Sequence, residues 1–137
     1  MNLLLYNKQY NIIDIRTSNI EFFIDEIVSS KYILSTSLHG LIIAHAYGIP
    51  ALWIKKGHIG SSEFKFHDYF SSVNIPLYEG FTNIEEILSN DENIEHLFQQ
   101  NINKSQINAP LCDIQQTLLK AAPFKLRREY ATIIQQN

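Results

Sequence analysis

Two short apolar segments on either side of one apolar helix constrain the fold of this chain more than any other feature. Residues 32–35 are YILS, residues 38–47 have a helical pattern that stops at Gly48 and Pro50, and residues 51–54 are ALWI. Strands of about four residues that are apolar on both faces and joined through a helix are typical of a parallel sheet covered on two sides. The sequence therefore predicts an α/β fold with a Rossmann-like parallel sheet flanked by helices.

The rest of the chain adds further elements to this unit. Residues 10–16 (YNIIDIR) are rich in β-branched side chains and predict another strand. Thr17 or Ser18 is a suitable N-cap for the helix that follows, whose apolar positions repeat at helical spacing: Ile20, Phe23, Ile24, Ile27 and Val28. Beyond residue 54 we expect a loop, then an aromatic helix at 64–72, then an edge strand or extended link at 75–80. One or two helices follow in 82–100, capped by Thr82 and broken near Asn90. A polar linker at 101–110 leads to two helices in 111–137 that are separated at Pro123.

The composition fits one domain of ordinary size. The chain has 137 residues, of which 45% are hydrophobic, enough to bury a core. We expect a single α/β domain over residues 1–137, with the sheet core and a donor site in residues 1–80 and a mostly helical part in residues 81–137. The net charge is -3 and the longest basic runs are Lys55-Lys56 and Arg127-Arg128, which argues against nucleic acid as a partner.

The cysteine content and the N-terminus bear on the compartment. A single cysteine, Cys112, forms no internal disulfide, and its place in a helical apolar pattern predicts a small core residue. The N-terminus lacks the apolar run and cleavage site of a signal peptide. No stretch approaches the roughly 18–20 apolar residues of a membrane span. We expect a soluble, cytoplasmic protein; a peripheral association with a membrane stays open.

The helix start at residues 37–40 is the place where the sequence predicts a ligand site. With Ser37 as the N-cap, the amides of Leu38, His39 and Gly40 have no carbonyl partner in the helix, and the helix dipole favours a small anion beside them. Gly40 leaves the backbone open to a ligand, and His39 offers an imidazole that can donate a proton. Hydroxyl groups add further donors at this carboxyl end of a strand: Ser35, Thr36 and Ser37.

A structural role explains some of the same residues. Ser is a common N-cap in any helix, and Gly40 also allows two helices to pack closely. His39 and His45 lie about 120° apart around the helix, so they do not easily share a metal ion, and no zinc-binding spacing occurs elsewhere. We expect His45 to be a hydrogen-bonded packing histidine, and we expect no metal site.

Residues 12–75 resemble the C-terminal half of the polysaccharide pyruvyl transferase family. The resemblance rests on Ser37-Leu38-His39-Gly40, on AYGIP at residues 46–50, and on the later block FKFHDYFSSVNIP at residues 64–76. The motif LLKAAPF at residues 118–124 is similar to the usual close of that family. The resemblance implies two α/β lobes like those of GT-B-type glycosyltransferases, with the active site in the cleft and this chain as the C-terminal, donor-binding lobe.

The resemblance also implies a chemistry. Characterised members move the enolpyruvyl group of phosphoenolpyruvate onto a sugar of a surface polysaccharide or its precursor, which implies phosphoenolpyruvate as donor and no further cofactor. In some members an Arg-Leu-His triplet at this turn contacts phosphoenolpyruvate; here Ser37 stands in place of the arginine, and His39 matches. Because arginine binds carboxylate and phosphate in a bidentate manner, either lysines of the next loop replace it or the donor differs.

These implications give each candidate residue a role. His39 is the candidate catalytic acid, since ketal formation needs a proton at the enol methylene carbon. The candidate binding residues comprise the helix start and the cationic side chains of the following loop and helix: Ser35, Thr36, Ser37, Leu38, Gly40, Lys55, Lys56, His58, Lys65 and His67. Each of the lysines and of the last two histidines also fits an ordinary solvated surface position.

The length of the chain leaves the partners and the function open. Two-lobed members need about twice this length, so we expect a fragment, a remnant or one half of a split enzyme. It would be completed by an N-terminal lobe, a partner chain or a homo-oligomer, and would act on a small anionic donor and a sugar or polysaccharide acceptor. Two other functions remain: a lobe of a nucleotide-sugar glycosyltransferase, and a non-catalytic domain that only binds or pairs.

Overall fold

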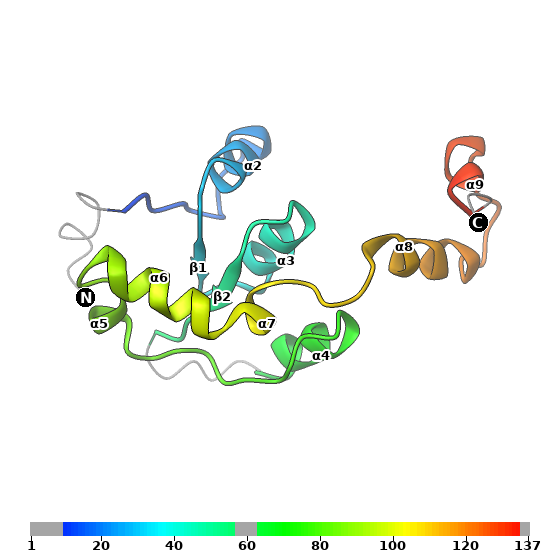
Figure 1. The fold of residues 1–137 in the computed structure, drawn as a ribbon. Coiled ribbons are helices and arrows are strands. Elements are labelled where there is room, and N and C mark those ends of the chain that lie inside the picture. The colour runs from blue at the N-terminus through cyan, green and yellow to red at the C-terminus, as the bar shows by residue number, and fades with distance from the viewer. Residues whose placement is uncertain (1–9, 57–62, 135–137) are drawn as a thin grey trace.

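The computed structural model describes residues 10–56 and 63–134. Within these residues it contains two strands and eight helices in an α/β arrangement (Figure 1). The first half consists of α2 (Ile20–Val28), β1 (Ile33–Ser35), α3 (Leu38–Ala46), β2 (Ala51–Trp53) and α4 (Phe64–Ser72). The second half is entirely helical and consists of α5 (Ile84–Ile87), α6 (Asp91–Gln100), α7 (Ile102–Ser105), α8 (Leu111–Lys120) and α9 (Arg128–Ile134).

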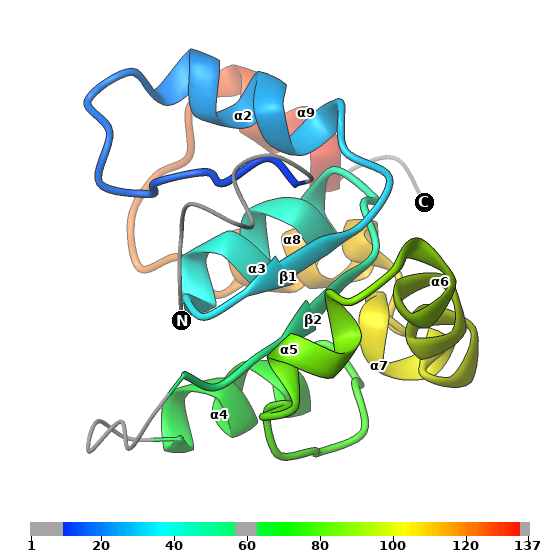
Figure 2. The same ribbon diagram turned by 90° about the vertical axis from the view of Figure 1, so that its left-hand side faces the viewer.

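The centre of the fold is the predicted β1–α3–β2 unit. The two strands pair in parallel, with Ile33 opposite Ala51 and Ser35 opposite Trp53. Helix α3 packs on both strands and α2 packs on α3 (Figure 2). The sequence predicted this parallel pairing correctly, and the strands are one residue shorter than the predicted apolar segments. The expected larger Rossmann-like sheet is a two-stranded sheet in the described residues.

The far edge of β2 is closed by groups from later parts of the chain. The amide of Phe81 donates to the carbonyl of Trp53 at 3.0 Å, and the amide of Lys55 donates to the carbonyl of Phe81 at 2.8 Å. The amide of Trp53 donates to the hydroxyl of Tyr78 at 2.9 Å. Burial raises the pKa of that tyrosine to about 12, so it stays protonated at neutral pH. The segment at 75–80 is therefore an extended link, of the two alternatives that Pro76 left open, and it satisfies this edge.

An aromatic cluster forms the core beside β2. The ring of Trp53 stacks on Phe66 of α4 with centroids 4.1 Å apart, and Phe70 stacks on Tyr78 at 4.8 Å. Trp53 is 2% exposed and Phe70 is fully buried. These contacts fix α4 against the sheet, and they explain why residues 64–72 form the aromatic helix that the sequence predicted.

The strand predicted at residues 10–16 does not form. The carboxylate of Asp14 accepts from the amide of Arg16 at 3.0 Å, and the carbonyl of Asp14 accepts from the amide of Thr17 at 3.3 Å. This local turn competes with extended backbone and bends the chain just before α2. The N-cap of α2 is Asn19, whose side chain accepts from the amide of Phe22 at 3.1 Å, and not Thr17 or Ser18 as predicted.

The second half agrees with the predicted helices in outline and differs in detail. The break near Asn90 is confirmed, since Asn90 is the N-cap of α6. Asn83 rather than Thr82 precedes α5, and α7 lies inside the predicted linker, where the carbonyl of Asn101 accepts from the amide of Ser105 at 3.1 Å. Cys112, predicted to be a core residue, is exposed.

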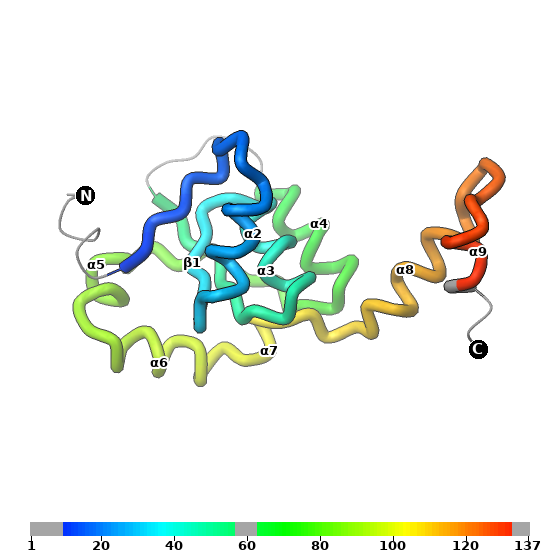
Figure 3. Tube along the Cα trace, turned by 90° about the horizontal axis from the view of Figure 1, so that it is seen from above, coloured from blue at the N-terminus to red at the C-terminus, as the bar shows by residue number. Residues whose placement is uncertain are grey.

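Helices α8 and α9 extend away from the body of the molecule. They pack on each other, and Figures 1 and 3 both place them apart from α2 and from α5 and α6. None of the described helices is long and apolar enough to cross a membrane.

Candidate functional site

The turn between β1 and α3 is shaped by the close approach of Ser35 and Gly40. The hydroxyl of Ser35 donates to the carbonyl of Ser37 at 2.8 Å and accepts from the amide of Ser37 at 3.1 Å. A Cβ atom added to Gly40 would lie 2.4 Å from the Ser35 oxygen, closer than real Cβ contacts come. Gly40 therefore admits the side chain of Ser35 to the helix start, and not the second helix that the structural alternative from the sequence expected there.

The first turn of α3 still presents free backbone donors. Ser37 is the N-cap in an extended conformation, and its own side chain makes no capping hydrogen bond. The first amide to bond back within the helix is that of Leu41, which donates to the carbonyl of Ser37 at 3.3 Å. The amides of Leu38, His39 and Gly40 precede it and have no acceptor among the residues that the structure describes. They form a partly positive end of the helix dipole.

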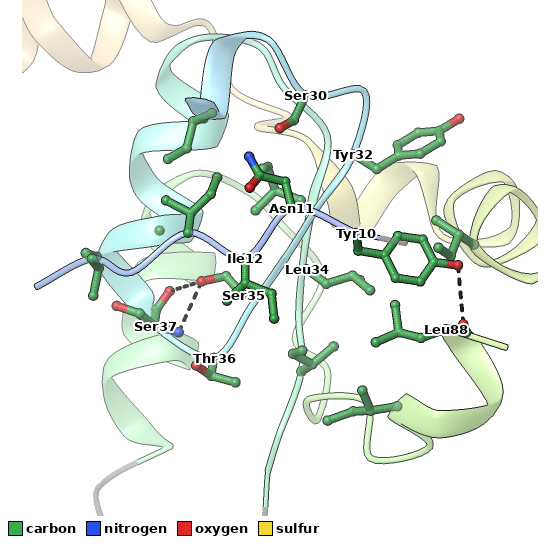
Figure 4. Close-up of a pocket in the computed structure, with 18 of the residues that line it drawn as sticks. Tyr10, Asn11, Ile12, Ser30, Tyr32, Leu34, Ser35, Thr36, Ser37 and Leu88 are labelled. Carbon is green, nitrogen blue, oxygen red and sulfur yellow. Dashed lines mark hydrogen bonds between the residues drawn. The ribbon is translucent and has the colours of Figure 1, made fainter. Parts of the chain in front are cut away.

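A cavity of about 500 Å³ lies beside this helix start, at the carboxyl end of β1. Its volume falls in the range of about 300–1,000 Å³ that is typical of small-molecule sites. Figure 4 shows Ser35, Thr36 and Ser37 together at one end of the cavity and Tyr10 with Leu88 at the other. Between them the walls are mainly aliphatic, from Ile12, Ile13, Ile27, Ile33, Leu34, Ile54, Ile84 and Ile94.

The cavity brings together about half of the residues that the sequence singled out. Its lining includes Ser35, Thr36, Ser37, Gly40 and Lys56. Leu38, His39, Lys55, Lys65 and His67 are not part of the lining, and His58 lies outside the described residues. His39 is exposed on the first turn of α3, between lining residues Ser37 and Gly40 in the sequence but not itself part of the lining.

Two lysines line the cavity, and they differ in their pairing. Lys31 forms an ion pair with Glu95 at 3.0 Å, which raises the pKa of the lysine and lowers that of the carboxyl. Lys56 makes no ion pair with any residue in 10–56 or 63–134. Lys56 is therefore the cation in this lining that is available to an anionic ligand.

Lys55 points into a separate polar cluster. Its ammonium group bonds to the carboxylates of Glu63 and Glu79, the latter at 2.6 Å, and lies 5.0 Å from the ring centroid of Trp53. The two hydrogen bonds raise the pKa of Lys55, and the bond to Lys55 lowers that of Glu79. His67 approaches Glu79 at 3.5 Å. These partners neutralise the charge of Lys55, so it offers little to a phosphate.

His45 is a packing histidine, as the sequence predicted. It is 5% exposed, and its ring nitrogens lie 3.0 Å from the hydroxyl of Tyr69 and 3.1 Å from the carbonyl of Ala51. Burial lowers the pKa of His45, so the ring is neutral at neutral pH. No group of three or more His, Cys, Asp or Glu side chains in the described part of the chain is arranged to hold a metal ion.

Sequence reasoning missed the far wall of the cavity. The hydroxyl of Tyr10 lies 3.3 Å from the carbonyl of Leu88 and 3.2 Å from Asp91 Oδ1, two acceptors for its one hydrogen, and so ties the N-terminal segment to the end of α5 and the start of α6 (Figure 4). Ile84 of α5 and Ile94 of α6 complete this wall. Nothing in the pattern of residues 10–16 or 84–94 indicates that these segments meet, because the contact joins positions about 80 residues apart.

Comparison with known proteins bears out the resemblance over the first part of the chain. The model of the polysaccharide pyruvyl transferase family matches residues 2–56, which include β1, α3, β2 and most of the cavity lining. The match ends before α4, so the likeness that we inferred for residues 64–76 and 118–124 stays a prediction.

One curated protein is similar to part of this chain. The uncharacterized protein L143 of Acanthamoeba polyphaga mimivirus is 37% identical over 65 residues, which make up 46% of this chain and 23% of that protein. The aligned part thus covers less than a quarter of that relative. No solved structure matches the chain.

Proposed function

We propose that this chain is the donor-binding part of a polysaccharide pyruvyl transferase and that phosphoenolpyruvate binds in the cavity at the start of α3. The observation that supports this most is the position of the cavity. It lies at the carboxyl end of β1, its lining contains Ser35, Ser37, Gly40 and Lys56, and these residues all fall within the stretch that the family model matches.

The proposed binding mode uses the groups that are available at this end of the cavity. One anionic group of phosphoenolpyruvate accepts from the free amides of the first turn of α3, and the hydroxyl of Ser37 adds a donor. The ammonium group of Lys56 neutralises the second anionic group. In the triplet of some family members an arginine stands at the position of Ser37. In this arrangement Lys56 and the free amides of α3 together take the place of that arginine.

The proposed reaction follows from the chemistry of the donor. A proton is added to the methylene carbon of phosphoenolpyruvate, and a sugar hydroxyl attacks the adjacent carbon and loses its proton. A second sugar hydroxyl then displaces inorganic phosphate from that carbon and gives its proton to the departing phosphate, which completes the pyruvate ketal. We assign the first proton to His39, which follows Leu38 on the first turn and has an exposed imidazole.

The rest of the active site is proposed to come from outside this chain. The walls of the cavity opposite Ser37 are aliphatic and offer few polar groups to a sugar. We therefore place the acceptor sugar in a second lobe, supplied by an N-terminal segment or a partner chain, as in a GT-B-type enzyme with this chain as its C-terminal lobe. The cytoplasmic location and the single-domain organisation expected from the sequence stay predictions.

A second function, binding without catalysis, is favoured by one observation. His39 is the residue to which the proton transfer is assigned, and it is not part of the cavity lining. A chain that binds phosphoenolpyruvate but never releases phosphate, even with a sugar acceptor and the missing lobe, would be such a binding module.

Isothermal titration calorimetry with phosphoenolpyruvate tests the proposed donor site. Lys56→Ala should weaken binding at least tenfold, which corresponds to about 1.4 kcal/mol. Lys65→Ala is the matched control, because Lys65 lies on α4 outside the cavity lining, and its affinity should equal that of the wild type. Heat released with a nucleotide sugar and not with phosphoenolpyruvate would instead support a glycosyltransferase lobe.

A further inference from the structure

The helical pair α8 and α9, with the segment that joins them, exposes several large apolar side chains. We call residues 111–134 the arm. Its side chains of Leu118, Phe124 and Tyr130 are 68%, 70% and 47% exposed. Figures 1 and 3 show α9 and the end of α8 standing off the body of the molecule, whereas Ile114, near the start of α8, packs against the core.

The same part of the arm is strongly basic. Lys120, Lys125, Arg127 and Arg128 fall within nine consecutive residues that contain no carboxylate. The ion pair within the arm, between Arg127 and Glu129, is weak. The two charged groups lie 4.0 Å apart, and their side chains are 84% and 65% exposed. The chain as a whole carries a net charge of -3, so the arm is a basic element on an acidic molecule.

Helix α2 presents the complementary surface. Ile20 and Val28 are 67% and 46% exposed, and Glu21 and Asp25 are exposed directly beside them on the helix. Helices α5 and α6 are also acidic in their first turns, but within the described residues neither exposes a large hydrophobic side chain. Among the acidic helices described, α2 is therefore the one that matches both the charge and the apolar character of the arm.

We propose that the arm docks on α2 of a second copy of this chain. No hydrogen bond or ion pair joins the arm to α2 of the same chain over the part that the structure describes, and the two lie apart in both views. In a twofold dimer each arm reaches the α2 of its partner, so the complementary contact forms twice. The acidic body weighs against an anionic membrane as the occupant, because it would be repelled from that surface. This inference does not depend on the proposed enzymatic function.

Charge reversal on each surface tests the pairing. One variant of the full chain carries Arg127→Glu and Arg128→Glu, and a second carries Glu21→Lys and Asp25→Lys. Sedimentation equilibrium should give a dimer for the wild-type chain of 15.9 kDa and a monomer for each variant alone. An equimolar mixture of the two variants should be dimeric again, because each reversed arm then meets a reversed α2.

Controls separate this outcome from general effects of charge and from misfolding. Glu85→Lys with Glu92→Lys makes the same change in net charge on α5 and α6 and should leave the dimer intact. Recovery in the mixture shows that both variants are folded, and circular dichroism checks each one separately. A monomeric wild type, a dimer that survives both reversals, or a mixture that stays monomeric overturns the proposal. Sedimentation of a monomeric wild type with phosphatidylserine vesicles would assign the arm to a membrane instead.

Discussion

At the scale of single residues, the account depends on how Ser35 and Gly40 share the space at the start of α3. Sequence reasoning identified both residues and expected a ligand to use the space that Gly40 leaves. The structure places the Ser35 hydroxyl there instead, where it bonds to both backbone groups of Ser37. The side chain of Ser35 thus orders the turn, and the amides that follow it remain for a ligand.

The steric clash in Gly40→Ala should lower the free energy of unfolding by roughly 1–3 kcal/mol. The higher helix propensity of alanine should offset up to about 1 kcal/mol of this loss. The reason is the 2.4 Å approach of the new Cβ atom to the Ser35 oxygen. In urea denaturation, adding Gly40→Ala to a Ser35→Ala background should have a much smaller effect, because the clashing oxygen is gone. Gly48→Ala is the control, since its φ of +73° strains alanine with no atom within 4 Å, and Ser35→Ala should not rescue it. Equal losses at Gly40 in both backgrounds would contradict this view of the turn.

His45 should make the stability of the protein fall as the pH is lowered below about 6.5. Burial lowers the pKa of His45 below its unfolded value of 6.5, so the unfolded chain binds the proton first as pH falls. The contribution of neutral His45 to the free energy of unfolding is therefore fully present above pH 6.5. Below that pH it declines by up to about 1.4 kcal/mol per pH unit. Urea midpoints of His45→Gln should vary less with pH below 6.5 than those of the wild type. An unchanged slope in His45→Gln would show that another group is responsible.

At the scale of elements, the helix starts are held by different residues from those that the sequence suggests. Asn19 and Asn90 accept from the amides of Phe22 and Asn93 at 3.1 and 2.8 Å, whereas the side chain of Ser37 caps nothing. A Ser at an N-cap position is the expected cap in a sequence, but the hydroxyl of Ser37 accepts from no amide of the first turn of α3.

Asn19→Ala and Asn90→Ala should therefore each lower the free energy of unfolding by about 1 kcal/mol, the usual effect of losing an N-cap. Ser37→Ala should lower it by no more than a few tenths, because no capping bond is lost. Thermal or urea unfolding monitored by circular dichroism measures all three. A loss at Ser37 as large as at Asn19 would mean that Ser37 caps α3 after all.

The β1–α3–β2 unit and the helices after it were predictable because local pattern determines them. Apolar strands, an apolar helix and a Gly-Pro stop all lie within 23 residues, and each element follows from its own sequence. The cavity was predictable only at its Ser35–Ser37 end. Its other wall depends on Tyr10 meeting Leu88, and on a turn at Asp14 that replaces the predicted strand. Such long-range contacts leave no trace in the periodicity of either segment.

At the scale of the whole molecule, two surfaces point to partners beyond the described residues. The cavity at α3 is polar at one end, which suits an anionic donor, and the arm is basic and apolar, which suits a second copy. The two sites are far enough apart to be tested independently, since the arm variants leave residues 35–40 and Lys56 untouched. Monomeric arm variants should therefore bind phosphoenolpyruvate as tightly as the wild type.

The central claim is that the amides at the start of α3 bind phosphoenolpyruvate, and amide chemical shifts measure this most directly. In a titration of the ¹⁵N-labelled chain, the amide signals of Leu38, His39 and Gly40 should move together and saturate, while those of α9 stay in place. Saturable shifts that map elsewhere, or no shifts at millimolar donor, would contradict the claim.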